Sequence, residues 1–267
     1  MSVFSPDLLK DEVALVTGGG SGICKGIARA FVAHGAQVGL VGRKADRLEA
    51  AAAELSALGP GRAFALPGDV RDYAAMEGVV DALLERAGGL HIVVNGAAGN
   101  FLCPSAQLSS NGFRTVLDID AVGTFNVSRV AFDKALRDGG GCILNISATL
   151  HHGATLLQAH ASAAKAAVDA TTRNMALEWG PAGVRVNGLA PGPIAETEGM
   201  ARLLPPGMGD RLRATIPLRR FGRIEEIANA ALFLVSGAAS LVTGAVLVVD
   251  GGASLPQAMS VALTSPG

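Results

Sequence analysis

The sequence predicts a single-domain α/β protein, built on a doubly wound sheet of seven parallel strands with helices on both faces. Short apolar runs alternate with longer helical segments along the 267 residues, which is the pattern of a parallel sheet. The chain is 49% hydrophobic and only 17% charged, so it can bury a large core. No repeat or linker divides it, and we therefore expect one domain over residues 1–267.

The apolar runs and the helical periodicity place the elements in order. The expected strands are Val13–Val16, Gln37–Val41, Ala63–Leu66, His91–Asn95, Cys142–Ile146, Val184–Leu189 and Ala245–Val249. Helices are expected from Ile23 to beyond Phe31 and over Ala45–Leu58, Tyr73–Arg86, Ser109–Leu136, Gln158–Trp179 and Ile224–Leu234.

One insertion, Pro191–Pro217, is rich in Pro, Gly and Arg, and we expect it to be irregular. It follows the carboxyl end of a strand, where open α/β sheets bind ligands. We interpret residues 191–217 as a substrate lid; a disordered surface loop is the alternative.

A glycine-rich turn follows the first expected strand. Thr17–Gly22 holds four glycines in six residues, and a helical pattern begins at Ile23. Strand, glycine turn and helix in this order are typical of a Rossmann-type dinucleotide site, where the helix N-terminus attracts phosphate. The predicted cofactor contacts here are Thr17, Gly18, Gly20, Ser21, Gly22 and Ile23. A glycine turn that binds nothing remains the alternative.

The end of the second expected strand indicates which nicotinamide cofactor is bound. NAD-preferring sites place an acid there for the ribose 2′-hydroxyl. Here the strand runs into Arg43 and Lys44, with no acid, and two adjacent cations suit a 2′-phosphate. We therefore predict NADP (NADPH), with a solvated basic turn as the alternative.

Charge and composition exclude several other classes of function. The net charge of −1 gives no reason to expect nucleic acid or an anionic membrane as partner. The N-terminus lacks the apolar core of a signal peptide. The uncharged stretch Ile227–Val249 is interrupted by glycines and hydroxyl residues, so we interpret it as a helix end, a loop and a strand rather than a membrane span. Three cysteines without a CxxC pair, and an end in Ser-Pro-Gly rather than a peroxisomal tripeptide, lead us to expect a cytoplasmic protein. No spacing of His, Cys and carboxylates predicts a metal site.

The expected helix Gln158–Trp179 carries small residues on nearly every face. Such a helix approaches the sheet on one side and a second element on the other. We expect that element to be a helix of another subunit, which makes the protein a homo-oligomer, a dimer or a tetramer. Burial under a loop of the same chain is the alternative.

Several motifs resemble those of the short-chain dehydrogenase/reductase family. Thr17, Gly18 and Gly22 match its TGxxxGxG loop, with Cys24 in place of the last glycine. The run Asn95–Gly99 resembles its NNAG segment, with Gly96 in place of the second Asn. Asn187, Pro191-Gly192 and Val249–Gly252 follow in the expected order. The resemblance implies further cofactor contacts at Asp69, Val70, Asn95, Ala97, Lys165, Pro191, Gly192, Ile194 and Thr197.

Members of that family usually reduce carbonyls with a Ser, a Tyr and a Lys. Lys165 matches the Lys, but Ala161 stands at the Tyr position and Ala148 at the Ser position. Asp120 replaces the family's catalytic Asn. Either the protein binds a nucleotide and catalyses nothing, or it transfers hydride in a reaction that needs no tyrosine.

The second possibility is favoured by a similarity to one group of the family, the peroxisomal 2,4-dienoyl-CoA reductases. It extends over Ala97–Pro104, Asp118–Val130, Ala163–Pro181 and Leu189–Gly199. In that group the tyrosine is likewise absent. The similarity implies reduction of a dienoyl-CoA to a 3-enoyl-CoA in fatty-acid degradation, with Asp120 and Lys165 catalytic. It also implies acyl-CoA or phosphate contacts at Arg43, Arg71, Phe101, Ser109, Ser110, Asn111 and Arg202.

Three other features stay open at this stage. His160 precedes the vacated tyrosine position, and it is either a replacement acid or simply a residue at the start of a helix. His151 and His152 are interpreted as solvated or pocket-lining, and Cys103 as packing. A 3-oxoacyl or carbonyl reductase with an atypical acid remains a further alternative.

Overall fold

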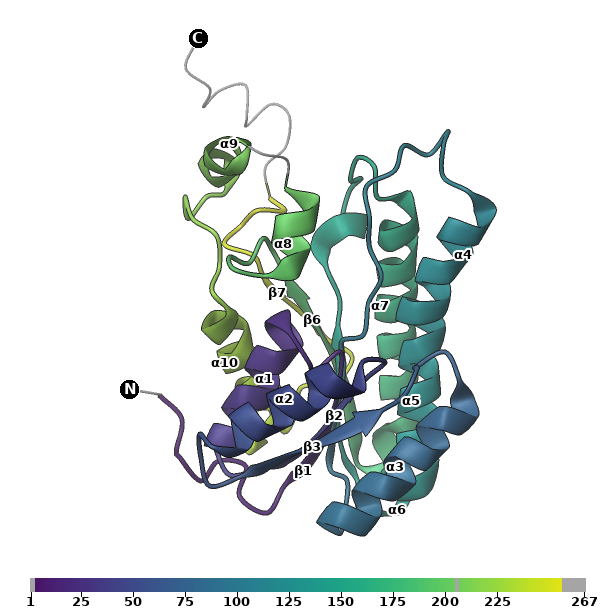
Figure 1. Cartoon of the computed structure of the whole chain (residues 1–267), viewed down its shortest axis with the longest axis vertical. Helices are drawn as coiled ribbons and strands as arrows, with labels where there is room; N and C mark the ends of the chain where they lie inside the picture. Colours follow the sequence, from purple (N-terminus) through teal and green to yellow (C-terminus); the bar gives the residue numbers. More distant parts are fainter. Residues whose placement is uncertain (1–2, 205–206, 256–267) are drawn as a thin grey trace.

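A computed structural model describes residues 3–204 and 207–255. Seven strands form one parallel sheet in the order β3-β2-β1-β4-β5-β6-β7 (Figure 1). Their bounds are β1 (Val13–Thr17), β2 (Gln37–Gly42), β3 (Arg62–Pro67), β4 (Ile92–Asn95), β5 (Gly141–Ile146), β6 (Val184–Pro191) and β7 (Val246–Val249). All seven predicted strands are confirmed, with ends that differ by a residue or two.

Ten α-helical segments are described. They are α1 (Gly22–Ala33), α2 (Ala45–Ser56), α3 (Tyr73–Ala87), α4 (Ser110–Leu117), α5 (Gly123–Ala131), α6 (Arg137–Gly139), α7 (Ala159–Trp179), α8 (Glu198–Leu203), α9 (Gly209–Thr215) and α10 (Ile224–Val235). Helices α1, α2 and α10 cover one face of the sheet, and α3, α5 and α7 cover the other (Figure 1).

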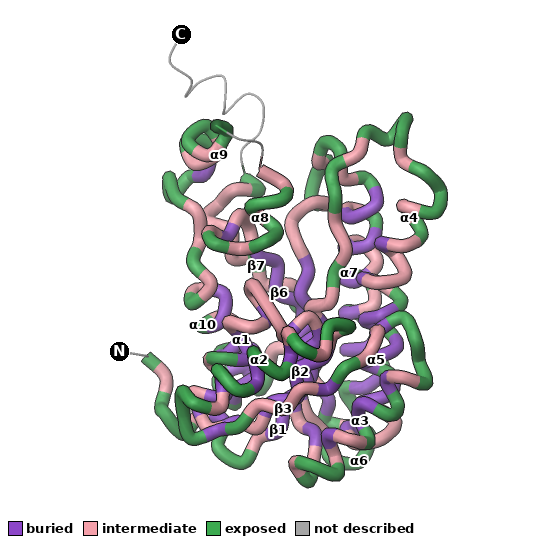
Figure 2. Tube along the Cα trace, in the orientation of Figure 1, coloured by how far each residue is buried: buried purple, intermediate pink, exposed green. Residues whose placement is uncertain are grey.

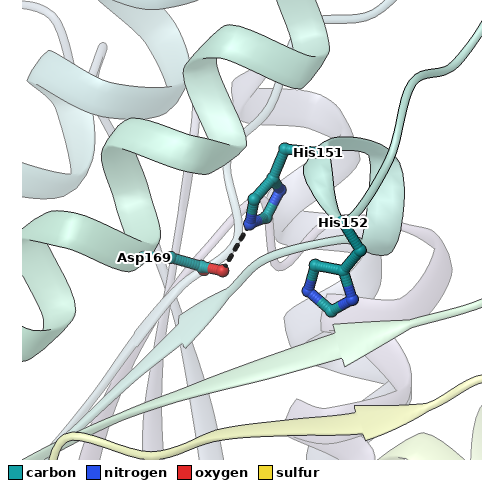
Figure 3. Close-up of side chains that lie close together, drawn as sticks. All are labelled: His151, His152 and Asp169. Atoms are coloured by element: carbon teal, nitrogen blue, oxygen red, sulfur yellow. Dashed lines mark hydrogen bonds and ion pairs between the residues drawn. The ribbon is translucent and has the colours of Figure 1, made fainter.

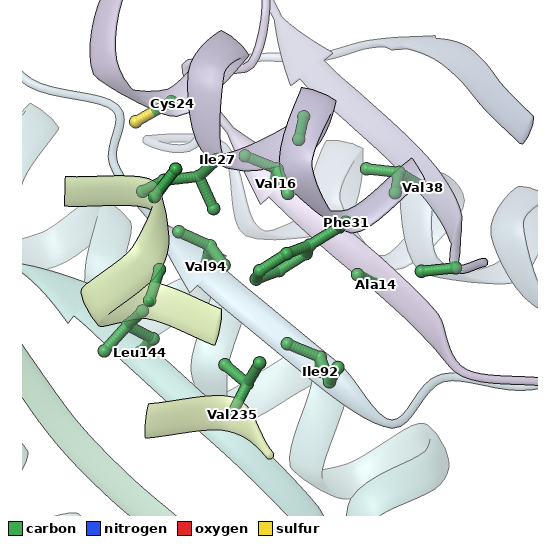
Figure 4. Packing of buried hydrophobic residues seen from close by; sticks show 14 of the residues in the cluster. Ala14, Val16, Cys24, Ile27, Phe31, Val38, Ile92, Val94, Leu144 and Val235 are labelled. Carbon is green, nitrogen blue, oxygen red and sulfur yellow. The ribbon is translucent and has the colours of Figure 1, made fainter. Parts of the chain in front are cut away.

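Each face of the sheet has its own apolar core. On one side Ile27 and Phe31 of α1 pack over Val16 and Val94 of the central strands, with α10 beside them (Figure 4). On the other side Leu15 and Val93 point toward α3, α5 and α7. Since burial is concentrated in the strands and the inner helix faces (Figure 2), both sides of the sheet are removed from water, as a parallel sheet requires.

The chain reverses its direction of winding at β1, which lies between β2 and β4. In an open α/β sheet the crevice outside the carboxyl ends of strands at this point binds ligands. The carboxyl ends of β1, β2 and β4 carry Thr17, Gly42 and Asn95, and these ends position the site described below.

Two expectations need correction. The segment 191–217 is not irregular throughout: it begins with the last residue of β6, Pro191, and contains α8 and α9. Thr197 caps α8 by accepting a hydrogen bond from the Met200 N–H. The helix expected over Ser109–Leu136 is one helical path in which Asp118–Val122 and Phe132–Leu136 adopt π-helical geometry. None of the helices described is long and apolar enough to cross a membrane.

Candidate active site

The glycine turn lies between β1 and α1, and its backbone adopts a conformation that favours glycine. Gly18 has φ +69°, and a Cβ on it would lie 2.9 Å from the carbonyl oxygen of Gly96. Ser21 precedes α1 with extended backbone and makes no side-chain capping bond, so it leaves the first N–H groups of α1 to other acceptors. This turn fits the phosphate-binding end of a dinucleotide site.

Thr17 ties this turn to the neighbouring strand end. Its buried hydroxyl accepts hydrogen bonds from the N–H groups of Gly96 (2.9 Å) and Ala97 (3.1 Å). Thr17 therefore fixes the loop after β4 against the glycine turn.

Cys24 and Gly96, the two departures from the family's loop patterns, are in contact. A Cβ placed on Gly96 would lie 2.1 Å from the Cys24 sulfur, so the thiol occupies the space that a larger residue at position 96 would need. Burial raises the pKa of the Cys24 thiol to about 12, which keeps it neutral. Cys24 is thus a packing residue between α1 and the β4 loop.

An open cleft of about 420 Å³ extends from the glycine turn across the ends of β2 and β3. Nine residues predicted to bind cofactor or substrate line it: Gly18, Gly20, Ser21, Arg43, Lys44, Asp69, Val70, Ala97 and Arg202. Arg47 and Glu198, which were not predicted from the sequence, also line it and form an ion pair between α2 and α8. Arg47 lies one helical turn after Arg43 and Lys44, and that spacing was the available signal.

Asp69 and Arg71 are paired at one end of this cleft. The Arg71 guanidinium donates to both carboxylate oxygens of Asp69, with the shortest contact, to Oδ2, at 2.6 Å. Hydrogen bonding from Arg71 lowers the pKa of Asp69 and outweighs the effect of burial. Arg71 itself is not part of the cleft lining, and its predicted contact with substrate stays a prediction.

The predicted catalytic pair is brought together by two neighbouring helical segments that pack against each other. Asp120 lies in the π-helical segment between α4 and α5, and Lys165 lies on α7; Asp120 Oδ2 is 3.1 Å from Lys165 Nζ. Both side chains are buried, with 1% and 8% of each residue exposed. π-Helical turns occur frequently at functional sites, and this one was not visible in the sequence.

Each member of the pair has one further partner. Gly99 N–H donates to Asp120 Oδ1 over 2.7 Å, and Lys165 Nζ donates to the Ile146 carbonyl over 2.8 Å. The loop after β4, the end of β5 and α7 therefore converge on one carboxylate and one ammonium group. Ile119, next to Asp120, lines the cleft that holds the glycine turn.

At the vacated tyrosine position Ala161 packs with Val116 and Ala164 in a small apolar cluster. His160, one residue earlier, is fully buried, and its ring stacks on the ring of Phe101 with centroids 4.2 Å apart. Both His160 ring nitrogens lack a hydrogen-bond partner among the residues described. Asn100 Oδ1 and Ser147 Oγ, also buried, lack one too.

Other predicted site residues have structural partners outside the cleft. The Asn95 amide donates to Ser128 and to Asn145, both over 2.8 Å, inside the core. Ser109 caps α4 by accepting from the Gly112 N–H, and Ser110 and Asn111 form the exposed first turn of that helix. Pro191 ends β6, and Gly192, Ile194 and Thr197 follow it; none of the four lines the cleft. Their contacts with ligands stay predictions.

His151 and His152 lie beside Asp169, a proximity that the sequence spacing did not reveal (Figure 3). His151 Nε2 is 2.8 Å from Asp169 Oδ2, and one potential ligand atom from each of the three residues lies within 4.8 Å of the others. His151 is partly buried and Asp169 is buried, so the pair ties the loop after β5 to α7.

A seven-stranded parallel sheet, a glycine turn at its switch point and a buried helix lysine define a nicotinamide-dependent oxidoreductase of the α/β class. The chain belongs to the short-chain dehydrogenase/reductase family: residues 18–254 match the family model described as enoyl-(acyl carrier protein) reductase.

The curated relatives agree with this family. The chain is 52% identical over 254 residues to a protein of Pongo abelii named peroxisomal 2,4-dienoyl-CoA reductase, (3E)-enoyl-CoA-producing, covering 95% of this chain and 87% of that one. A Saccharomyces cerevisiae protein of the same name is 43% identical, covering 92% and 85%. A Bacillus subtilis protein named probable 2,4-dienoyl-CoA reductase, (2E)-enoyl-CoA-producing, is 36% identical, covering 91% and 97%.

Solved structures show the same fold. A short-chain dehydrogenase/reductase from Mycobacterium ulcerans superimposes with a TM-score of 0.88 at 38% identity, covering 93% of this chain and 92% of that one. A 7α-hydroxysteroid dehydrogenase complexed with NADH superimposes with a TM-score of 0.88 at 33% identity, covering 94% and 98%.

Proposed function

We propose that this protein is an NADPH-dependent reductase of 2,4-dienoyl-CoA, or of a similar unsaturated acyl-CoA, and that it forms a 3-enoyl-CoA in fatty-acid degradation. The observation that carries the proposal is the buried Asp120–Lys165 pair, 3.1 Å apart, in a site with Ala161 at the tyrosine position and Ala148 at the serine position. The relatives named as dienoyl-CoA reductases support the same substrate class.

The reaction accounts for the missing tyrosine. The chemistry that NADPH supplies when bound is a hydride for C5 of the conjugated thioester. Electron density then moves through the double bonds to the thioester oxygen, and stabilising it requires hydrogen-bond donors where the charge develops, not a phenol. The α-carbon finally takes a proton, which yields the 3-enoyl product.

Asp120 and Lys165 have separate roles in this proposal. Lys165 holds the nicotinamide ribose and, with Asp120, orders the water that gives a proton to the α-carbon; the hydroxide left behind takes a proton from solvent. Asp120 is held in its orientation by its two partners, the Lys165 ammonium and the Gly99 N–H. Because both side chains are buried, their charges act in a site of low dielectric constant.

The cofactor preference rests on Arg43 and Lys44. Both line the cleft that begins at the glycine turn, and no acid follows β2 to bond a ribose 2′-hydroxyl. Two cations at this place favour the extra phosphate of NADP. The segment 191–217, which includes α8 and α9, is proposed to cover the bound substrate, with Arg202 of α8 reaching the cleft.

The deciding experiment follows NADPH oxidation at 340 nm with three additions: a 2,4-dienoyl-CoA, a 3-oxoacyl-CoA and free CoA. Turnover with the dienoyl substrate alone, with a 3-enoyl product identified by mass spectrometry and NMR, supports the proposal. A 2-enoyl product would reject the proposed protonation at the α-carbon. Turnover with the 3-oxoacyl substrate would instead support a carbonyl reductase with an atypical acid.

A non-catalytic nucleotide-binding protein is the second candidate, and Ala148, Ala161 and Cys24 favour it. It predicts NADPH binding by calorimetry without oxidation in any of the three assays. We further propose a homo-oligomer, a dimer or a tetramer, located in the cytoplasm. The similar eukaryotic proteins are named as peroxisomal, so cell fractionation tests the location directly.

A further inference from the structure

We propose that His160 donates a hydrogen bond to the thioester carbonyl oxygen of the bound acyl-CoA and so stabilises the charge that forms there. The inference rests on the proposed function and names a donor that it leaves unassigned. Its basis is a buried imidazole whose face is packed and whose nitrogens have no partner in the described part of the chain.

A fully buried histidine ordinarily pairs both nitrogens with protein groups or water, because an unmade hydrogen bond inside a protein is destabilising. The Phe101 ring, with its centroid 4.2 Å away, packs against the face of the His160 ring and forms no hydrogen bond with its nitrogens. Whichever tautomer is present, at least one nitrogen carries a hydrogen. His160 therefore has an N–H donor that is free to bond a group of a bound ligand.

The other unpartnered atoms indicate where that group binds. Seven buried side-chain atoms lack partners among the described residues, and four of them lie on His160, Asn100 and Ser147. Asn100 follows Gly99, whose N–H holds Asp120, and Ser147 follows Ile146, whose carbonyl holds Lys165. Asn100 and Ser147 thus adjoin the two residues that hold the catalytic pair, and His160 lies five residues before Lys165 on α7.

The other donors near this pair are engaged, except the Ser147 hydroxyl, which has no partner among the described residues. Lys165 Nζ is bonded to the Ile146 carbonyl and paired with Asp120, and the proposed function assigns its third N–H to the nicotinamide ribose. The Asn100 amide donates to Gln158 Oε1 over 2.6 Å. Ala148 and Ala161 have no donor in their side chains. Two buried donors in this region are therefore uncommitted, and the His160 imidazole is the one that is completely buried, whereas Ser147 is 3% exposed.

Phe101 provides the route by which the substrate reaches His160. Phe101 is 37% exposed while His160, on which its ring stacks, is fully buried, so movement of Phe101 would uncover one face of the imidazole. The loop that carries Phe101 is joined to the start of α7 by the Asn100–Gln158 bond and by the Cys103 N–H, which donates to the Leu157 carbonyl over 2.8 Å. This loop and α7 therefore enclose the acyl end of the substrate together.

Two substitutions at position 160 test the role of the donor. His160→Phe keeps an aromatic ring against Phe101 and removes both nitrogens; His160→Gln keeps an N–H donor. We expect His160→Phe to lower kcat with a dienoyl-CoA about 100-fold or more, the usual effect of losing one oxyanion donor, with NADPH affinity within twofold. His160→Gln should recover activity to within about tenfold of the wild type. His152→Phe, an exposed histidine in the preceding loop, is the matched control.

A binding measurement separates this inference from the proposed function. An acyl-CoA thioester and the corresponding S-alkyl-CoA thioether differ in the carbonyl oxygen, so the ratio of their Kd values reports the contact to that oxygen. We expect the wild type to prefer the thioester at least tenfold and His160→Phe to lose that preference. Equal preference in both proteins, or kcat of His160→Phe within threefold of wild type, would overturn the role of His160. Absence of wild-type turnover with a retained thioester preference would instead reject only the reductase activity.

Discussion

The carboxylate of Asp120 is the single group on which we expect the chemistry to depend most. Asp120→Asn keeps an acceptor for the Gly99 N–H and removes the charge opposite Lys165. Because the proposed proton delivery needs that charge, kcat should fall about 100- to 10,000-fold, the range for losing a general acid–base group. Steady-state kinetics with a dienoyl-CoA measure this, and calorimetry should show NADPH affinity unchanged.

Asp118→Asn is the matched control, since Asp118 is a partly exposed carboxylate two residues away. It should keep activity within twofold. If Asp120→Asn turns over as fast as the wild type, Asp120 has no part in the mechanism.

Arg43 is the residue that we expect to select NADPH over NADH. Arg43→Ala removes one of two adjacent cations from the cleft lining, so it should weaken NADPH at least tenfold and NADH less than twofold. Both Kd values are measured by fluorescence titration. Arg62→Ala, an exposed arginine at the start of β3, should change neither. Equal losses for both cofactors would contradict the assignment of NADP.

At the scale of elements, Cys24 and Gly96 show how two departures from the family pattern compensate each other between α1 and the β4 loop. Gly96→Ala places a methyl group 2.1 Å from the Cys24 sulfur and should lower the free energy of unfolding by about 1–3 kcal/mol. Cys24→Ala removes the sulfur, and the double variant should recover most of that loss.

Urea unfolding of the four proteins gives the coupling energy directly. Gly153→Ala is the control, because no atom lies within 4 Å of a Cβ at that exposed position. If the two substitutions are additive, the contact between Cys24 and position 96 does not explain the glycine.

The start of α10 depends on Glu226. The Arg220 side chain and the Arg223 N–H donate to its carboxylate, and these bonds lower its pKa to about 2. A carboxyl whose pKa is lower in the folded state stabilises the fold above its unfolded pKa, near 4.5, and loses that contribution as pH falls toward 2.

Glu226→Gln should therefore lower the melting temperature at pH 7 but not near pH 2. We expect about 1 kcal/mol at pH 7, since the Arg220 partner is half exposed and water screens the pair. Thermal unfolding across this pH range checks it, with the exposed Glu225→Gln as control. An equal effect at both ends of the range would show that charge is not the cause.

Much of this element-scale arrangement follows from the sequence. The seven strands were predictable because each is a short apolar run between helical segments, and parallel strands buried on both faces need such runs. The π-helical turn at Asp120 was not, since its residues carry no signal that separates it from an α-helix. The pairing of Asp120 with Lys165 and of His151 with Asp169 joins residues 45 and 18 positions apart, and only the packing of α7 against its neighbours brings them together.

At the scale of the whole molecule, we expect the outer surface of α5 and α7 to form the contact between subunits of the oligomer. Val122 and Phe125 are exposed three residues apart, and on α7 Ala163 and Ala170 present small exposed side chains near the highly exposed Leu177. An apolar face with small residues lets a second copy approach closely, and a twofold axis makes the same face serve both partners.

A charged residue on this face should prevent association. We expect Phe125→Glu to convert the wild-type oligomer into smaller species in sedimentation velocity, because a carboxylate would be buried without a partner at the contact. Leu58→Glu, which alters a comparably exposed apolar residue after α2, should leave the sedimentation coefficient unchanged. A monomeric wild type, or an oligomer unaffected by Phe125→Glu, would show that subunits do not meet through α5 and α7.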